Sequence, residues 1–106
     1  MTKVGRFAGI LEEVKELQNS GRKLKKEKVL MRELHNYSGV EIREVRLQAK
    51  MTQSIFAFVL GVSKKTVEAW EGGRSKPTGS ALRLLGLIAD NPNFAEDNKI
   101  IVRELV

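Results

Sequence analysis

The sequence contains no cysteine and a single histidine, His35. Without thiolates, disulfide bonds and cysteine-ligated metal sites are excluded, and one imidazole cannot form a zinc site by itself. The lack of cysteine also excludes catalytic Cys–His pairs, and a catalytic serine triad would have to use His35. Neither a G-x-x-x-x-G-K-[ST] loop nor a G-x-G-x-x-G turn occurs. We therefore expect no enzymatic activity, no metal and no cofactor.

Long apolar runs are also missing. No stretch approaches the ~20 apolar residues of a membrane span, and the first residues lack the apolar block of a signal peptide. We therefore expect a soluble, cytoplasmic protein. Its 106 residues suffice for one domain with a small core and an appended arm. The 19 lysines and arginines outnumber 13 acidic residues, and the resulting net charge of +6 suits a polyanionic partner.

The most informative stretch is residues 51–77. Thr52 is a good N-cap residue, and it precedes a short apolar series that predicts a helix over about residues 52–60. This series consists of Ile55, Phe56 and Val59. Gly61 can adopt the positive φ found just after a helix, and Ser63 can cap a second helix. The connection between the two helices is therefore only a few residues long.

In the second predicted helix, Val67 and Trp70 fall on one side and indicate a core-facing surface, with Trp70 as a core residue rather than a stacking platform. The first turn is cationic and polar, and its side chains cannot all point into a core: Lys64, Lys65 and Thr66. Gly72 and Gly73 end the helix, and a basic turn over residues 74–77 follows. Two short helices with this tight connection predict a helix-turn-helix, whose second helix fits the DNA major groove.

The pattern M-T-Q-S-x-x-A-x-x-x-G-V-S-x-x-T-V-x-x-W-E-x-G-R-x-x-P resembles the Xre (lambda-repressor-like) family over roughly residues 41–90. The resemblance implies a mainly all-α bundle. It also implies that Lys64 and Lys65 reach bases, that Gln53 and Thr66 assist, and that an Arg46–Glu71 pair is structural. With the caps and the basic turn, the predicted DNA-binding residues are Thr52, Gln53, Ser63, Lys64, Lys65, Thr66, Arg74 and Lys76. Because these lysines lack the rigid fork of arginine, the operator sequence is not predicted.

Ahead of this module, an apolar series with helical spacing predicts an amphipathic helix over about residues 6–19. Residues 22–28 then hold five cations and one anion, which fit either a solvated connector or a contact to a nucleic acid or an acidic partner. The short apolar segment that follows fits a strand-like arm or a helical turn: Val29, Leu30, Met31 and Leu34. His35 is interpreted as an ordinary surface or packing residue.

Two further helices are predicted around the helix-turn-helix. Ser38 and Glu41 have the capping-box spacing and introduce a helix over about residues 39–50. Thr78 or Ser80 can cap a leucine-rich helix that ends at residues 90–92 and is apolar on more than one face, so that some apolar surface is left for a subunit contact. The last segment is ambiguous between helix and strand. The predicted organisation is therefore an arm (1–36), a DNA-binding domain (37–92) and a tail (93–106) that contributes to dimerisation.

A basic arm before such a domain, together with G-R-S-K-P-T-G-S-A-L-R-L-L-G-L-I-A-D-N-P, resembles the HigA-type antitoxins of type II toxin-antitoxin systems. That resemblance implies a homodimer that binds operator DNA, represses its own operon and neutralises a RelE-like (HigB-like) mRNA-cleaving toxin by binding it. The expected toxin-binding residues are Phe7, Ile10, Leu11, Val14, Leu17, Lys25, Lys26 and Leu30. The alternative is a stand-alone Xre-type repressor of phage or metabolic origin. An RNA-binding module is less favoured, because no aromatic-rich surface sheet is predicted.

Overall fold

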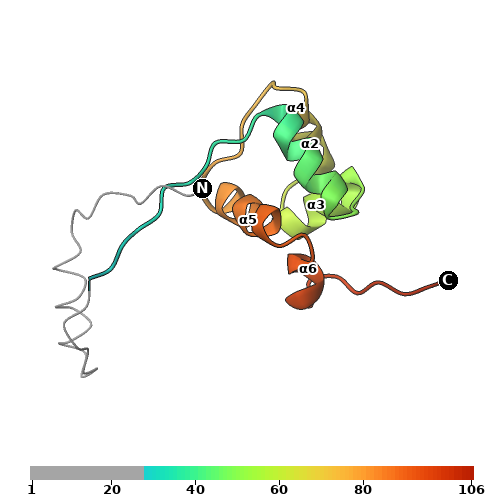
Figure 1. Cartoon of the computed structure of the whole chain (residues 1–106). Coiled ribbons are helices and arrows are strands. Elements are labelled where there is room, and N and C mark those ends of the chain that lie inside the picture. The colour runs from blue at the N-terminus through green and yellow to red at the C-terminus, as the bar shows by residue number, and fades with distance from the viewer. Residues whose placement is uncertain (1–27) are drawn as a thin grey trace. The chain divides into compact units, whose positions relative to one another are not determined.

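The structure is a computed structural model that describes residues 28–106 (Figure 1). The chain divides into two units, Met1–Glu33 and Leu34–Val106. The predicted amphipathic helix and most of the basic run lie outside the described residues, and so do all the expected toxin-binding residues except Leu30. Leu30 is 52% exposed and lies outside any helix.

The second unit is a bundle of helices. They are α2 (Gly39–Gln48), α3 (Gln53–Leu60), α4 (Lys64–Glu71), α5 (Gly79–Asp90) and the short α6 (Phe94–Asp97). Figure 1 shows α2, α3 and α4 grouped together, with α5 beside them and α6 after α5. No β-strand forms within residues 34–106. The predicted all-α helix-turn-helix bundle is confirmed, whereas the β-segment allowed at the C-terminus does not form.

The starts of α2, α3 and α4 follow local capping signals. At the start of α2, the Glu41 backbone N–H donates to Ser38 Oγ at 3.2 Å, and the Ser38 backbone N–H donates to Glu41 Oε1 at 2.9 Å. This capping box confirms the prediction, and the Ser38 backbone hydrogen bond lowers the pKa of Glu41. Thr52 Oγ1 accepts from the Ile55 backbone N–H at 3.1 Å at the start of α3. Gly61, with φ of 70°, ends α3 in the left-handed conformation.

The core lies between α2, α3, α4 and α5, and Ala95 of α6 closes it. Phe56, Val67 and Leu85 are completely buried, and Trp70 is only 4% exposed, which confirms its expected core role. Each such apolar side chain contributes about 1.5–3 kcal/mol through burial. On α5, one face enters the core while Leu87 stays 42% exposed. Apolar surface therefore remains outside the core on this helix, as its sequence predicts.

A close backbone contact fixes α2 against the end of α4. A Cβ built on Gly39 would lie 2.5 Å from the Glu71 carbonyl oxygen and 2.8 Å from that of Trp70. Such distances are too short for any side chain, so only glycine allows the first turn of α2 to approach these carbonyl groups. Gly39 therefore sets the distance between α2 and α4. The functional site depends on this distance.

The C-terminal segment packs on the domain before it becomes extended. Ala95 of α6 is fully buried, and Ile100 and Ile101 pack partly buried against the core. Arg103 then bridges two elements: its Nε donates to Glu96 Oε2 at 2.7 Å, and its Nη2 donates to the Ala49 carbonyl at 2.9 Å. The residues after 92 therefore form one helical turn and an extended end, and part of this segment belongs to the core.

Candidate nucleic-acid interface

The turn between α3 and α4 is held by a short hydrogen-bond network. Ser63 Oγ accepts from the Thr66 backbone N–H at 3.1 Å and lies 2.8 Å from Thr66 Oγ1. Val62 packs against the core, which anchors the turn from inside. Because the Thr66 hydroxyl takes part in the cap, α4 begins abruptly at Lys64 with a fixed direction.

Two lysines occupy the first turn of α4. The side chains of Lys64 and Lys65 are both exposed, and neither forms an ion pair within residues 28–106. The first turn contains no acidic residue. A helix N-terminus carries a partial positive charge, so cations placed there are disfavoured by about 0.3–1 kcal/mol each. This arrangement lowers the local stability of α4 while presenting two free ammonium groups to the solvent.

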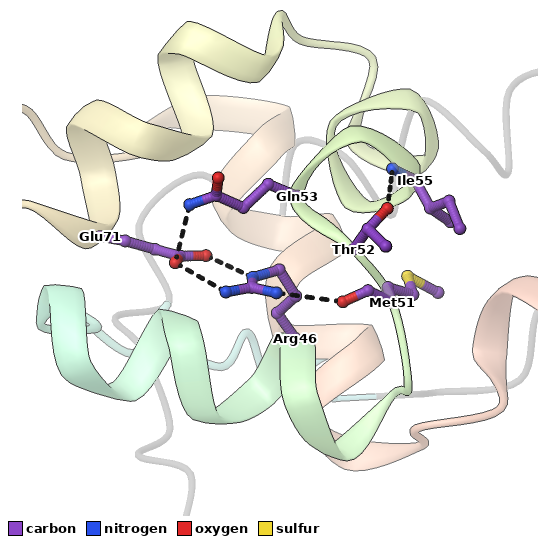
Figure 2. A network of polar contacts seen from close by, with 6 residues as sticks. All are labelled: Arg46, Met51, Thr52, Gln53, Ile55 and Glu71. Carbon is purple, nitrogen blue, oxygen red and sulfur yellow. Dashed lines mark hydrogen bonds and ion pairs between the residues drawn. The ribbon is translucent and has the colours of Figure 1, made fainter.

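A part-buried ion pair fixes α4 relative to α2. Arg46 Nε donates to Glu71 Oε2 at 2.7 Å, and Arg46 Nη2 donates to Glu71 Oε1 at 3.1 Å (Figure 2). The two side chains are only 11% and 8% exposed. The same guanidinium also donates from Nη1 to the Met51 carbonyl at 3.1 Å. The Arg46–Glu71 pair expected from the family resemblance is thereby confirmed as a part-buried, two-pronged contact.

Gln53 adds the start of α3 to this network. Its Nε2 donates to Glu71 Oε1 at 3.2 Å, as Figure 2 shows. A single carboxylate on α4 therefore receives side chains from both α2 and α3. The resemblance predicted a contact of Gln53 with DNA, and the structure adds an inward contact that sequence spacing does not reveal.

The basic turn after α4 is exposed at Arg74 and Lys76, and its backbone reverses at Gly73, where φ is 75°. Arg74 and Arg43 line the same open pocket, which has a volume of about 540 Å³. Arg43 is absent from the predicted site. The signal available in the sequence was its position three residues before Arg46, which puts both arginines on neighbouring positions of one α2 face.

Within residues 28–106, no group of three or more His, Cys, Asp or Glu residues is placed to hold a metal ion. His35 packs edge-on against Tyr37, with 4.5 Å between ring centroids, and lies 3.6 Å from Glu41 Oε2, consistent with an ordinary packing role. In the same part of the chain, no helix combines the length and apolar character needed to cross a bilayer.

Comparison with known proteins gives a consistent result. A family described as helix-turn-helix matches residues 42–86. Antitoxin HigA-2 from Vibrio cholerae is 44% identical over 57 residues, which cover 54% of this chain and 55% of that protein. The uncharacterized HTH-type transcriptional regulator YiaG from Escherichia coli is 42% identical over 59 residues, which cover 56% of this chain and 62% of that regulator. The chain thus spans a little over half the length of these two relatives.

A third match is confined to a small part of a larger protein. The type II methyltransferase M.SsoII from Shigella sonnei is 41% identical over 56 residues, but these cover only 15% of the methyltransferase. The shared stretch is therefore a minor part of that enzyme. The matched family, the two shorter relatives and the α3–turn–α4 geometry agree with one another. Residues 42–86 of this chain therefore contain a helix-turn-helix domain that is similar to those of the Xre type.

Proposed function

We propose that this protein is a transcriptional regulator that binds a specific sequence in double-stranded DNA by placing the first turn of α4 in the major groove. The observation that carries this proposal is the pair of exposed, unpaired lysines at the start of α4. Two cations at the N-terminus of α4 lower the stability of this helix. Binding of their ammonium groups to a negatively polarised ligand would offset this loss. The major groove provides one, because guanine presents its O6 and N7 acceptors there.

The surrounding residues have complementary roles in the proposal. Lys64 and Lys65 read base edges, and Gln53 and Thr66 assist them. Ser63 and Thr52 fix the helix starts, whose free backbone N–H groups can face phosphates. Arg74 and Lys76, both exposed in the turn behind α4, neutralise the DNA backbone. The buried contact of Arg46 with Glu71 keeps these groups in one orientation.

We further propose that the protein binds its operator as a homodimer. A single module of this size buries only about 600–1,000 Å² on DNA, which is small for tight operator binding. Two copies on half-sites about one helical turn apart would add their contacts. Apolar side chains that stay exposed, such as Leu87 on α5 and Val102 in the tail, provide surface for such an assembly.

We propose, more specifically, that the protein is an antitoxin. It would repress its own operon and neutralise a RelE-like toxin through residues 1–36. The match to a protein named antitoxin HigA-2 supports it, together with the basic arm that precedes the domain. The match to YiaG, which is named a transcriptional regulator, supports the alternative of a stand-alone repressor equally well. The two possibilities share the DNA-binding domain and differ in the role of the arm.

DNA binding is tested by competition at fixed salt concentration. The labelled probe is the duplex that lies upstream of the protein's own reading frame, and the competitors are the unlabelled probe, a shuffled duplex and single-stranded RNA. We expect only the unlabelled probe to compete efficiently. Equal competition by the RNA would contradict the proposal, because A-form and single-stranded RNA are recognised through different surfaces.

The toxin proposal is tested by co-expression with the product of the neighbouring reading frame. The full chain should co-purify with that protein and suppress its mRNA cleavage, whereas a chain lacking residues 1–36 should bind DNA but not the toxin. A neighbouring frame without nuclease activity would favour the stand-alone repressor. A truncated chain that still inhibits the nuclease would contradict the role given to residues 1–36.

A further inference from the structure

Arginines from two separate elements line one open pocket beside α4. α2 contributes Arg43 and Arg46, and the turn after α4 contributes Arg74. Gln53 from α3 and two glutamates of α4, Glu68 and Glu71, complete the polar lining. The pocket has a volume of about 540 Å³, which is ample for a single phosphate group with its water.

The charges in this pocket are unequally balanced. Arg46 is neutralised by its two hydrogen bonds to Glu71. Arg43 and Arg74 form no ion pair with any of residues 28–106, and Glu68 likewise has none. Two free guanidinium groups therefore face one free carboxylate. The pocket keeps a surplus of one positive charge and of planar N–H donors, which suits a monoanionic phosphodiester.

Gly72 has a steric rather than a conformational role at the edge of this pocket. Its φ of −84° and ψ of −1° are accessible to any residue. A Cβ at this position would, however, lie 2.7 Å from Arg74 Nη1, 3.2 Å from the Glu68 carbonyl oxygen and 3.4 Å from Arg74 Cζ. The missing side chain is therefore what allows the guanidinium group of Arg74 to fold back over the end of α4, on the side of the pocket. The turn itself is made by the next residue, Gly73, whose φ is 75°.

We propose that Arg43 and Arg74 together bind one phosphodiester group of the DNA backbone at the mouth of this pocket, and that Gly72 leaves free the space in which the Arg74 guanidinium lies. This inference rests on the proposed DNA binding. It makes α2 a direct part of the interface, although α2 lies outside the helix-turn-helix itself. It also gives Glu68 a function: its negative charge opposes the phosphate and limits the strength of sequence-independent binding.

The test measures affinity for two duplexes, the upstream probe and a shuffled one, over a range of salt concentrations with the full chain. Arg43→Gln and Arg74→Gln should each weaken binding to both duplexes by about tenfold. Affinity falls as salt rises, so the slope of log affinity against log salt is negative. Each variant should make this slope shallower by about 1 for every protomer bound. Glu68→Gln should strengthen binding to both duplexes. The matched control is Arg83→Gln, since Arg83 is exposed on α5 and does not line the pocket; it should leave affinity and slope unchanged.

Gly72→Ala tests the positioning role through a double-mutant cycle. In the wild-type background it should weaken binding to both duplexes, but less than Arg74→Gln does, because the end of the exposed Arg74 side chain can shift to make room for the added Cβ. In the Arg74→Gln background it should have no further effect, because the group it displaces is already gone. The thermal midpoint of each variant shows whether the fold is retained. If Gly72→Ala unfolds the domain, the affinities and salt slopes of Arg43→Gln and Arg74→Gln test the phosphate site without it.

The outcomes separate this inference from the proposed function. If the wild-type protein does not discriminate the upstream duplex from the shuffled one, and the two α4 lysines can be replaced without effect, the proposed function fails. If the wild-type protein binds specifically but Arg43→Gln and Arg74→Gln behave like Arg83→Gln, only the phosphate site is overturned. Weakened binding confined to one of the two duplexes would also overturn it, because a backbone contact carries no sequence information.

Discussion

Arg46 on α2 and Glu71 at the end of α4 form a part-buried ion pair, with 2.7 Å between Arg46 Nε and Glu71 Oε2. Gln53 at the start of α3 donates to the same carboxylate at 3.2 Å. One side chain thus connects all three helices of the proposed interface. The orientation of α4 therefore depends on a residue of α2, and the buried network is expected to influence DNA recognition without touching the DNA bases.

Breaking this ion pair should be strongly destabilising. Arg46→Met or Glu71→Leu alone should lower the free energy of unfolding by more than about 1 kcal/mol and by up to about 3–5 kcal/mol, because each leaves a part-buried charge without its ionic partner. The double variant should recover most of that loss, since two apolar side chains can fill the site. Urea denaturation of the four proteins measures the coupling. A loss below about 1 kcal/mol in the single variants would mean that the pair behaves like a solvated one.

Replacing the two α4 lysines should stabilise the protein. Lys64→Ala together with Lys65→Ala removes two cations from the positive end of α4 and introduces good helix formers, which should raise the free energy of unfolding by about 0.5–2 kcal/mol in total. Lys76→Ala is the matched control, because Lys76 is exposed in a turn outside any helix. It should leave stability unchanged. A destabilised double variant would show that these lysines support the fold instead of serving a ligand.

Two glycines should respond in opposite ways to alanine. Gly39→Ala should lower the free energy of unfolding by about 1–3 kcal/mol, because its Cβ would collide with the backbone of α4. Gly86→Ala should raise it by about 0.5–1 kcal/mol, because Gly86 lies inside α5 and its Cβ would meet only the Tyr37 hydroxyl at 3.8 Å. Thermal and urea unfolding give both values. Equal effects of the two substitutions would contradict the close approach of α2 to α4.

The capping box of α2 should contribute a pH-dependent stability. The Ser38 hydrogen bonds lower the pKa of Glu41 below its ordinary value of 4.5. A carboxylate with a lowered folded-state pKa stabilises the fold above its unfolded pKa, and this contribution is lost as the pH falls through the folded pKa. Glu41→Gln keeps an acceptor for the Ser38 N–H but does not titrate. Its stability should therefore fall less than that of the wild type when the pH is lowered from neutral to below 4.5.

A second, independent variant for this measurement is Glu96→Gln. The hydrogen bond from Arg103 lowers the pKa of Glu96, so this second carboxylate adds its own acid sensitivity at a separate place. Each variant should reduce the loss of folding stability on acidification independently of the other. The double variant should show the sum of the two reductions. Identical pH profiles for the wild type and Glu41→Gln would show that the capping box carries no such contribution.

The features that the sequence predicted correctly are local or periodic. The N-caps at Ser38, Thr52 and Ser63 and the left-handed Gly61 depend on neighbours three or four residues away, and the structure confirms all four. The core role of Trp70 follows from helical spacing, and the structure confirms it as well. The DNA and toxin contacts of the predicted residues remain predictions.

The features that the sequence did not predict depend on contacts between distant elements. The inward hydrogen bond of Gln53 and the close approach at Gly39 join different helices, and no spacing rule indicates them. Gly72 was interpreted only as a helix end, and the position of the Arg74 guanidinium where a Cβ of residue 72 would lie is set by the folded turn. The ambiguous C-terminal segment is resolved by packing, because burial of Ala95 selects a helical turn where local propensity favours neither state.

The most direct test of the central claim is the selectivity of the Lys64→Ala, Lys65→Ala double variant for the upstream duplex over a shuffled duplex, measured at one salt concentration. Each base contact contributes about 1–3 kcal/mol of discrimination, so we expect most of the selectivity to disappear while the domain stays folded. Lys99→Gly is the control, since it removes an exposed cation that follows α6 at a positive φ of 58°. Unchanged selectivity in the folded double variant would contradict the proposal that α4 reads DNA.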